Sequence, residues 1–372
     1  MATYDLKEYL YPLWKAKRIV HETAMLVGED DSAPLLFTPD KVEKVTDYGQ
    51  QTVYALGKDY TVSGNRIVPI KGGAMPYMER EVYYRDTPAS IMKNGKEEPL
   101  PITVMPEKLR EDIRLEGKRY FAFGRKDIFN SKQISVTYTH SGEWNKYIPE
   151  GYADVFKGFF ERVKAGEKPT LLFYGDSITT GCDSSGANNF IVEPAVDSFA
   201  VMVHKYLSEK FGEINYVNTA VGGWNSRNAV ANFEERVIAH KPDLLILGFG
   251  MNDGRFSTQE YHDLYVKMLN RLREVCPDTP VLLVGTMIPN FESDWYGVHR
   301  YFVDELYKLQ GEYKDIGVCN MTKFSIDVYD MGKRFRDMTG NNVNHPNDFM
   351  ARMYGQLILK ALLGDEFEKD FE

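Results

Sequence analysis

Cysteines and cofactor-binding motifs are scarce in this sequence. Only three of the 372 residues are cysteines, and Cys182, Cys276 and Cys319 form no Cys-x-x-Cys pair. Their scatter excludes a disulfide framework and argues against a zinc cluster. The carboxylates form no group with metal-ligand spacing, and there is neither a Gly-x-x-x-x-Gly-Lys-Ser/Thr loop nor a Gly-x-Gly-x-x-Gly turn. We therefore expect no metal and no cofactor.

Long apolar runs and an excess of positive charge are missing as well. The longest aliphatic stretch, residues 281–288, is far shorter than the roughly 20 residues that a membrane-spanning helix needs. Residues 1–8 show no basic segment followed by an apolar run, so no secretory signal is visible. The 45 basic and 54 acidic residues give a net charge of −9, without a basic cluster. We therefore expect a cytoplasmic protein without nucleic-acid or membrane partners, and leave homo-oligomer formation open.

The composition is that of an ordinary globular protein, and the length suits two domains. Apolar residues make up 43% and charged residues 27% of the chain, which is enough apolar material for a buried core. Residues 19–27, 52–56, 66–70 and 133–139 are short stretches rich in β-branched and aliphatic residues, with turn residues between them. This pattern predicts a β-sandwich of the jelly-roll type over residues 1–150.

From residue 151 to 372, apolar strands alternate with amphipathic helices. The five strands are predicted at residues 170–174, 214–218, 243–248, 280–285 and 317–321. The clearest helix covers residues 258–275, where apolar residues recur at helical spacing after a capping box of Ser257 and Glu260. Apolar strands joined by helical crossovers predict a doubly wound, parallel five-stranded sheet with helices on both faces. Ligands bind such sheets beyond the carboxyl ends of the strands.

Polar residues and glycines gather where three of these strands end. Gly-Asp-Ser at residues 175–177 follows the first strand, and Gly-Gly-Trp at residues 222–224 follows the second. Gly-Met-Asn-Asp at residues 250–253 follows the third, and a polar segment with Asn342 and His345 precedes the last helix. Because the carboxyl ends of parallel strands share one edge of the sheet, the first three motifs must lie together.

These residues supply what acyl transfer requires. A serine at a strand end, here Ser177, can be a nucleophile if a base takes its proton. His345 is the only one of the seven histidines that lies among small turn residues before a helix. The Ser177 amide, the Gly223 amide and the Asn252 side chain would be three donors to an oxyanion. Each such donor typically stabilises the transition state by about 3 kcal/mol.

The same residues resemble the four sequence blocks of the SGNH (GDSL) hydrolases. The blocks occur in the family's order over roughly residues 168–362: Gly175-Asp176-Ser177, Gly223, Gly250-x-Asn252-Asp253 and His345-Pro346. The resemblance implies a flavodoxin-like three-layer fold and serine-dependent ester hydrolysis. It assigns Ser177 as nucleophile, His345 as general base, and Gly223 and Asn252 as oxyanion donors.

One position departs from the family pattern. The family places an aspartate three residues before the histidine, where this sequence has Asn342. In serine proteases the equivalent loss of a carboxylate lowers turnover about 10⁴-fold. Three explanations stay open: a backbone carbonyl orients His345 in a Ser-His dyad, Asp337 or Asp348 takes the role, or the site is impaired. We prefer the first, which some two-domain carbohydrate esterases of the family are thought to use.

The layout also resembles that of bacterial carbohydrate acetylesterases such as the acetyl xylan esterases, where a β-rich domain precedes the SGNH domain. This likeness implies removal of O-acetyl groups from acetylated plant oligosaccharides during hemicellulose degradation. Asp176, Trp224 and Trp295 are expected to contact this small-molecule substrate. Two other functions stay open. One is a lysophospholipase or acyl-thioesterase with the same chemistry, and the other is a glycan-binding protein whose esterase site has decayed.

Overall fold

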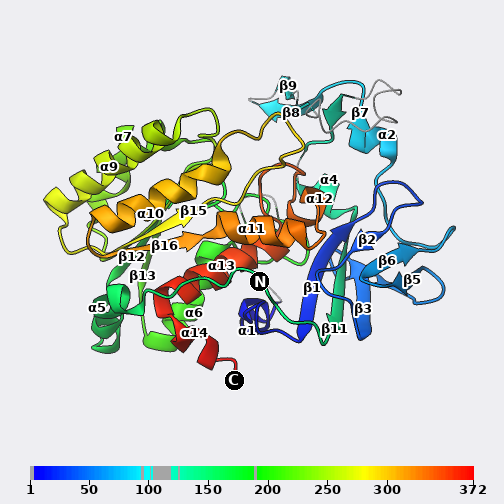
Figure 1. Ribbon diagram of the computed structural model, residues 1–372, viewed down its shortest axis with the longest axis horizontal. Helices are drawn as coiled ribbons and strands as arrows, with labels where there is room; N and C mark the ends of the chain where they lie inside the picture. The colour runs from blue at the N-terminus through cyan, green and yellow to red at the C-terminus, as the bar shows by residue number, and fades with distance from the viewer. Residues whose placement is uncertain (1–3, 94–95, 101, 104–118, 125, 188–190) are drawn as a thin grey trace.

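A β-rich part and an α/β part lie side by side in the computed structural model, coloured blue to cyan and green to red in Figure 1. The structure describes residues 4–93, 96–100, 102–103, 119–124, 126–187 and 191–372. The change from one part to the other falls between strand β11 (Gln133–Thr139) and helix α5 (Ala153–Lys164). The domain boundary after residue 150 is consistent with this change and stays a prediction.

Antiparallel pairing builds the β-rich part. Its main sheet has the order β1 (Arg18–Met25), β11, β3 (Lys41–Asp47) and β4 (Val53–Tyr54). A three-stranded sheet and two strand pairs accompany it: β2 (Ala33–Pro34), β6 (Arg66–Pro69) and β5 (Tyr60–Ser63), then β7 (Tyr84–Arg85) with β10 (Tyr120–Phe121), and β8 (Ala89–Lys93) with β9 (Lys96–Leu100). The described residues of this part also form the short helices α1 (Leu6–Leu10), α2 (Arg80–Tyr83) and α4 (Lys126–Asn130). The predicted β-rich character is confirmed, and the jelly-roll connectivity stays a prediction.

The α/β part contains the predicted parallel five-stranded sheet. Its strand order is β13 (Asn215–Asn218), β12 (Thr170–Gly175), β14 (Leu244–Gly248), β15 (Val281–Gly285) and β16 (Ile316–Asn320). All neighbouring strands of this sheet are parallel. In chain order this is 2-1-3-4-5, the flavodoxin-like arrangement, so the fold prediction is confirmed.

Helices cover both faces of this sheet because its strands are apolar on both sides. Leu171 and Phe173 point into one apolar cluster, and Leu172 and Tyr174 point into another, as the alternation along a strand requires. The first cluster includes residues of α5, α6 (Phe199–Phe211), α11 (Met321–Asp330) and α13 (Asp348–Leu363). The second includes residues of α7 (Ser226–Ala231), α8 (Phe233–Arg236), α9 (Thr258–Val275) and α10 (Phe302–Glu312).

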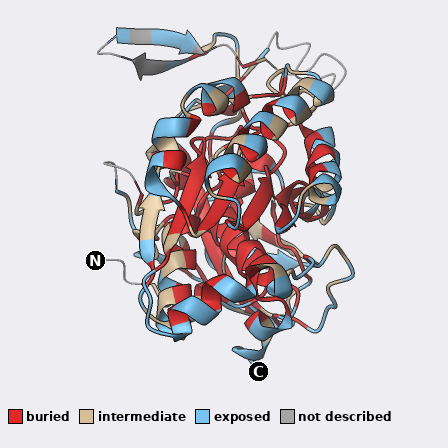
Figure 2. Cartoon of the chain, turned by 90° about the vertical axis from the view of Figure 1, so that its left-hand side faces the viewer, coloured by how far each residue is buried: buried red, intermediate tan, exposed pale blue. Residues whose placement is uncertain are grey.

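Helix α13 joins the two parts of the molecule. All 16 of its residues are buried, and Figure 2 shows buried residues gathered along the parallel strands and the helices against them. It packs on α5, α6 and β16 on one side, and on α1 and β1 of the β-rich part on the other. The Gln356 side chain accepts the Leu13 amide at 3.0 Å and donates to the Tyr9 carbonyl at 2.9 Å. Helix α13, which follows the segment of His345, is therefore held by both parts.

Two kinds of feature are missing from the described residues. No helix within these ranges combines the length and the apolarity needed to span a bilayer. The same residues hold no group of three or more His, Cys, Asp or Glu side chains suited to a metal ion.

Candidate active site

Ser177 follows strand β12 at the carboxyl end of the parallel sheet. Gly175 permits the tight turn, because a Cβ at this position would lie 2.5 Å from the Gly248 carbonyl oxygen on the neighbouring strand. The Asp176 carboxylate stabilises the turn by accepting the Ile178 amide at 2.9 Å. The turn places Ser177 between β12 and β14, where the strand order reverses and ligands bind in this class of sheet.

His345 meets Ser177 at this edge of the sheet. Its Nε2 lies 2.9 Å from Ser177 Oγ, although the two residues are 168 positions apart. Asn341 shapes the segment that carries the histidine. Its Oδ1 accepts the amides of Val343 and Asn344 at 3.0 Å and that of His345 at 3.2 Å. A fixed turn directly before α13 therefore holds the imidazole against the serine hydroxyl.

The carboxylate beside His345 belongs to Asp183, which sequence reasoning missed. Asp183 Oδ2 lies 3.3 Å from His345 Nδ1. With its proton on Nδ1, the ring donates to Asp183 while Nε2 accepts the Ser177 hydroxyl. This is the tautomer that a general base for Ser177 requires. The available signal was an aspartate in the loop directly after Ser177, on the same edge of the sheet.

Asn342, at the family's aspartate position, makes its side-chain hydrogen bonds to the β-rich part and not to the histidine. Its Nδ2 donates to the Ala122 carbonyl at 3.2 Å, and its Oδ1 accepts the Tyr83 hydroxyl at 3.0 Å. The residue in the family's aspartate position is thus bound to the β-rich part. The preference for a backbone carbonyl is also wrong, because His345 Nδ1 faces a carboxylate.

Asp337 and Asp348, the two other expected acids, are buried in contacts of their own. Asp337 accepts the amides of Met25 at 2.8 Å and Arg334 at 2.7 Å. Asp348 accepts the amide of Ser185 at 2.7 Å. Burial raises the pKa of both carboxyls, that of Asp348 to about 6. The expectation that either one orients the histidine is therefore corrected in favour of the acid that follows the nucleophile.

The expected oxyanion donors lie on the loops after β12, β13 and β14. Gly223 has a φ of +80°, a conformation that favours glycine, and a Cβ on Gly222 would lie 3.8 Å from Ser177 Cβ. Among the described residues, no hydrogen-bond acceptor occupies the amides of Ser177 and Gly223. Asn252 uses one of its two N–H groups on the Trp224 carbonyl at 2.8 Å. Two amides and one side-chain N–H group are thus available to an anionic oxygen.

His299, which the sequence did not single out, fixes the loop that carries Asn252. Its Nδ1 accepts the Gly297 amide at 3.1 Å, and its Nε2 donates to the Met251 carbonyl at 3.0 Å. Burial lowers its pKa to about 4, so the ring stays neutral near pH 7. Any Cβ at Gly254 would collide with the ring, which explains why a glycine follows the Asn-Asp pair.

A cavity of about 280 Å³ opens beside Asn252. Trp295, Arg255 and Asp294 line it, and Ile102 contributes a wall from the β-rich part. Asp294 is tied to this wall, because its carboxylate and its amide exchange hydrogen bonds of 2.9 Å with the backbone of Thr103. Both parts of the molecule therefore shape the space beside Asn252, and the contact of Trp295 with a substrate stays a prediction.

Trp224 and Asp176, the two other expected substrate contacts, are engaged in packing and in the turn after β12. The half-buried Trp224 packs against the apolar cluster under α7 and α9, with the Arg236 guanidinium 5.5 Å from its ring. Its contact with a substrate stays a prediction. Asp176 is only 1% exposed, and burial raises its pKa to about 7. The carboxylate stabilises the turn through the Ile178 amide, and its contact with a substrate stays a prediction.

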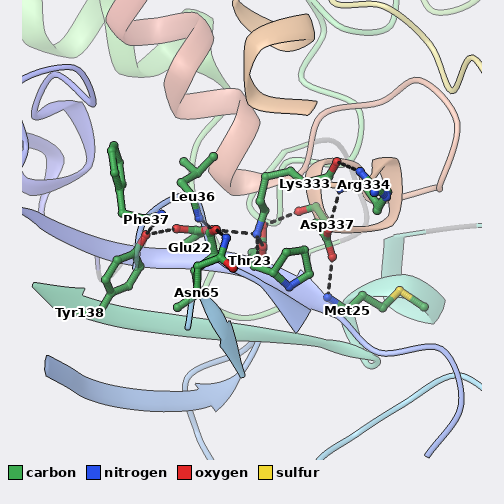
Figure 3. A network of polar contacts seen from close by, with 12 residues as sticks. Glu22, Thr23, Met25, Leu36, Phe37, Asn65, Tyr138, Lys333, Arg334 and Asp337 are labelled. Carbon is green, nitrogen blue, oxygen red and sulfur yellow. Dashed lines mark hydrogen bonds and ion pairs between the residues drawn. The ribbon is translucent and has the colours of Figure 1, made fainter. Parts of the chain in front are cut away.

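The β-rich part also holds the segment between α11 and α13. Figure 3 shows the centre of this contact, where Lys333 and Glu22 form a fully buried ion pair at 2.8 Å. The Tyr138 hydroxyl donates to the second oxygen of Glu22 at 2.6 Å. Closer to the candidate site, Gln133 donates to the Thr339 carbonyl at 2.8 Å. These contacts fix the position from which the histidine segment starts.

Comparisons with known proteins concern the same region of the chain. Residues 173–352 match the sequence profile of the GDSL-like Lipase/Acylhydrolase family. Among solved structures, the chain is similar to a two-domain esterase (CEX) active on acetylated mannans and co-crystallised with mannopentaose. This match has 22% identity and a TM-score of 0.48, and covers 59% of this chain and 55% of that one.

A second similar structure is Axe2, an acetylxylan esterase from Geobacillus stearothermophilus. It matches with 20% identity and a TM-score of 0.43 over 54% of this chain and 95% of that one. The chain thus spans little more than half the length of the two-domain esterase, 55% of it. A comparison with curated proteins gave no match.

Proposed function

We propose that the protein is a serine esterase that removes O-acetyl groups from acetylated oligosaccharides, and the match of residues 173–352 to the GDSL-like Lipase/Acylhydrolase family supports this. One observation carries this proposal. Ser177 Oγ lies 2.9 Å from His345 Nε2, at the edge of the sheet where two amides have no partner among the described residues. A nucleophile, its base and an oxyanion site are thus assembled in one place.

The proposed reaction has two steps. First, His345 Nε2 takes the proton of Ser177 Oγ, which attacks the ester carbonyl carbon. The carbonyl oxygen becomes an oxyanion, which accepts hydrogen bonds from the amides of Ser177 and Gly223 and from Asn252. The ester C–O bond then breaks as His345 returns the proton to the leaving alcohol. In the second step, His345 takes a proton from water, which attacks the acyl-enzyme, and returns the proton to Ser177 as the acid leaves.

The size and lining of the cavity support a small, sugar-like substrate. Its volume of about 280 Å³ is near the lower end of the roughly 300–1,000 Å³ common for small-ligand sites. Trp295 offers a flat apolar face, and Arg255 and Asp294 offer polar groups, as a sugar ring requires. A long acyl chain of a lysophospholipid or a thioester would need more apolar volume. A decayed site is disfavoured by the complete Ser177–His345 pair.

The test is hydrolysis by the wild-type protein of p-nitrophenyl acetate, butyrate and octanoate, together with acetate release from acetylated xylo-, manno- and chito-oligosaccharides. We expect acetyl esters to react fastest, and Ser177→Ala to lose about 10⁴–10⁶-fold in kcat. Ser208→Ala, on the distant helix α6, is the matched control and should behave like the wild type.

Each other outcome has a defined meaning. Full activity of Ser177→Ala would refute the nucleophile assignment. A preference for octanoate would favour the lysophospholipase or thioesterase. Glycan binding without acetate release would favour the decayed site.

A further inference from the structure

A buried lysine of the β-rich part holds the loop that follows the nucleophile, residues 182–187, called here the acid loop. Lys126 of helix α4 is 4% exposed. Its Nζ donates to the carbonyl oxygens of Ser184 at 2.7 Å and Ala187 at 2.9 Å, and lies 3.4 Å from that of Ser185. Because an ammonium group has three donors, all of them are used on the acid loop.

The charges around Lys126 fit this arrangement. Burial lowers its pKa, whereas the carboxylates of Asp183, Asp348 and Asp127 and the Cys182 thiol all favour its charged form. Asp348, at the start of α13, also accepts the amide of an acid-loop residue at 2.7 Å. The acid loop is therefore clamped by α4 of the β-rich part on one side and by α13 on the other.

The histidine segment is shaped to admit Asp183. Gly340 lies against this side chain, and a Cβ there would be 2.7 Å from Asp183 Cβ, closer than real atoms approach. The Gly340 amide donates to the His345 carbonyl at 3.0 Å, so the glycine belongs to the same turn as the base. Asp183 itself has a φ of +67°, which few residues other than glycine adopt. The left-handed backbone and the missing side chain opposite it both serve to bring one carboxylate to the imidazole.

The β-rich part also occupies the position from which this family's acid usually comes. At Asn342 an amide is required, because the side chain must donate to the Ala122 carbonyl as well as accept the Tyr83 hydroxyl. A carboxylate would set an anionic oxygen against that carbonyl. The contact with the β-rich part thus excludes a carboxylate at Asn342, and the contact of Lys126 supports Asp183 in the acid loop instead.

We propose that Asp183 is the positioning residue of His345 and that Lys126 holds it there, so that the β-rich part contributes to turnover itself. This inference rests on the proposed function, because it concerns the same Ser177–His345 pair. Asp183 keeps the proton on His345 Nδ1. It also stabilises the imidazolium that forms when the ring takes the proton of Ser177.

The first test is kinetic. Asp183→Asn and Asp183→Ala should lower kcat for p-nitrophenyl acetate about 10²–10³-fold, with KM changed less than about threefold. Added formate should restore part of the activity of Asp183→Ala but none of Ser177→Ala. A purely structural aspartate would not give this rescue.

The second test addresses the support from the β-rich part. Lys126→Met should lower kcat about 10-fold, whereas Lys132→Met, just beyond helix α4, should match the wild type. If Lys126→Met does not fold, formate rescue of Asp183→Ala still tests the role of Asp183.

The two levels of the proposal can fail separately. Wild-type kcat in Asp183→Ala would overturn the inference while Ser177-dependent hydrolysis still stands. Absence of Ser177-dependent hydrolysis in the wild type would overturn the proposed function.

Discussion

Asn342→Asp would restore the family's usual acid at a position that this protein uses to join its two parts. The side chain is fully buried, and its Nδ2 donates to the Ala122 carbonyl at 3.2 Å. A carboxylate cannot donate there, so it would face a carbonyl oxygen while losing its contact with water. The new carboxyl can keep this hydrogen bond only by retaining a proton.

The stability loss follows from that proton. In the unfolded chain the new carboxyl ionises with a pKa of about 3.9, and burial holds its pKa in the folded protein well above this value. The folded state then binds more protons than the unfolded state, so stability falls as the pH rises above about 4. The loss is about 1.4 kcal/mol per pH unit until the carboxyl ionises in the folded protein. We expect Asn342→Asp to be less stable than the wild type by about 2–4 kcal/mol at pH 7.5, in addition to any loss already present at pH 4.5.

Urea unfolding at pH 4.5 and 7.5, followed by tryptophan fluorescence, measures this difference directly. Asn344→Asp is the matched control, because Asn344 uses its Oδ1 to accept a hydrogen bond from the side-chain Nδ2 of Asn341, and a carboxylate can do the same. We also expect no gain in kcat from Asn342→Asp, because the new acid would not face His345. A variant as stable as the wild type at pH 7.5, or one with raised kcat, would refute this reasoning.

Three further changes test other parts of the structure. His299→Phe removes the hydrogen bond to the Met251 carbonyl in the loop of Asn252, and with it the bond from the Gly297 amide. It should lower kcat about 10-fold in steady-state assays, whereas an unchanged kcat would show that the loop keeps its conformation without His299. Burial raises the pKa of Asp253 to about 6, so this group should lower the free energy of unfolding of the wild type as the pH rises from 4 to 6. In urea unfolding, Asp253→Asn should therefore lose about 3 kcal/mol less than the wild type over that pH interval. Equal slopes of the free energy of unfolding against pH in the wild type and in Asp253→Asn would contradict this expectation. Lys333→Met leaves Glu22 buried without its cation and should cost about 3–5 kcal/mol in urea unfolding. The double variant Glu22→Gln/Lys333→Met should recover part of that loss, and no recovery would mean that the ion pair is not its source.

Local pattern was sufficient for the α/β part. Its strands are apolar on both faces, so residues such as 170–175 and 281–285 stand out as short apolar runs between amphipathic helices. Each predicted strand end lies within one residue of the observed one. Ser257 caps α9 as expected, accepting the Glu260 amide at 3.1 Å. Topology then determines that the carboxyl ends of these strands share one edge of the sheet.

The β-rich part was harder to predict from sequence. Strand β11 was recognised with its observed bounds because residues 133–139 alternate. The pair of β7 and β10 has only two residues in each strand, which is too short for any periodicity. Such pairs form because tertiary contacts hold them, here the apolar cluster that includes Tyr83 and Phe121.

The candidate site, too, was only partly predictable from the sequence. Ser177 and His345 could be proposed because their residue types and their places at element ends carry the chemistry. Asp183 could not, because its position depends on contacts from Lys126 and Asp348, which are distant in sequence. The sequence pattern indicates acids near the histidine in the chain, whereas the acid loop follows the serine and folds back to the histidine.

Covalent labelling of the nucleophile decides whether this protein is a serine esterase. Diethyl p-nitrophenyl phosphate reacts with a serine whose proton is taken by a neighbouring base, and peptide mass spectrometry locates the adduct. We expect one diethylphosphoryl group on Ser177, loss of esterase activity in proportion to labelling, and labelling slowed about 10³-fold or more in His345→Ala. An adduct at another residue, or activity that survives complete labelling of Ser177, would contradict the assignment.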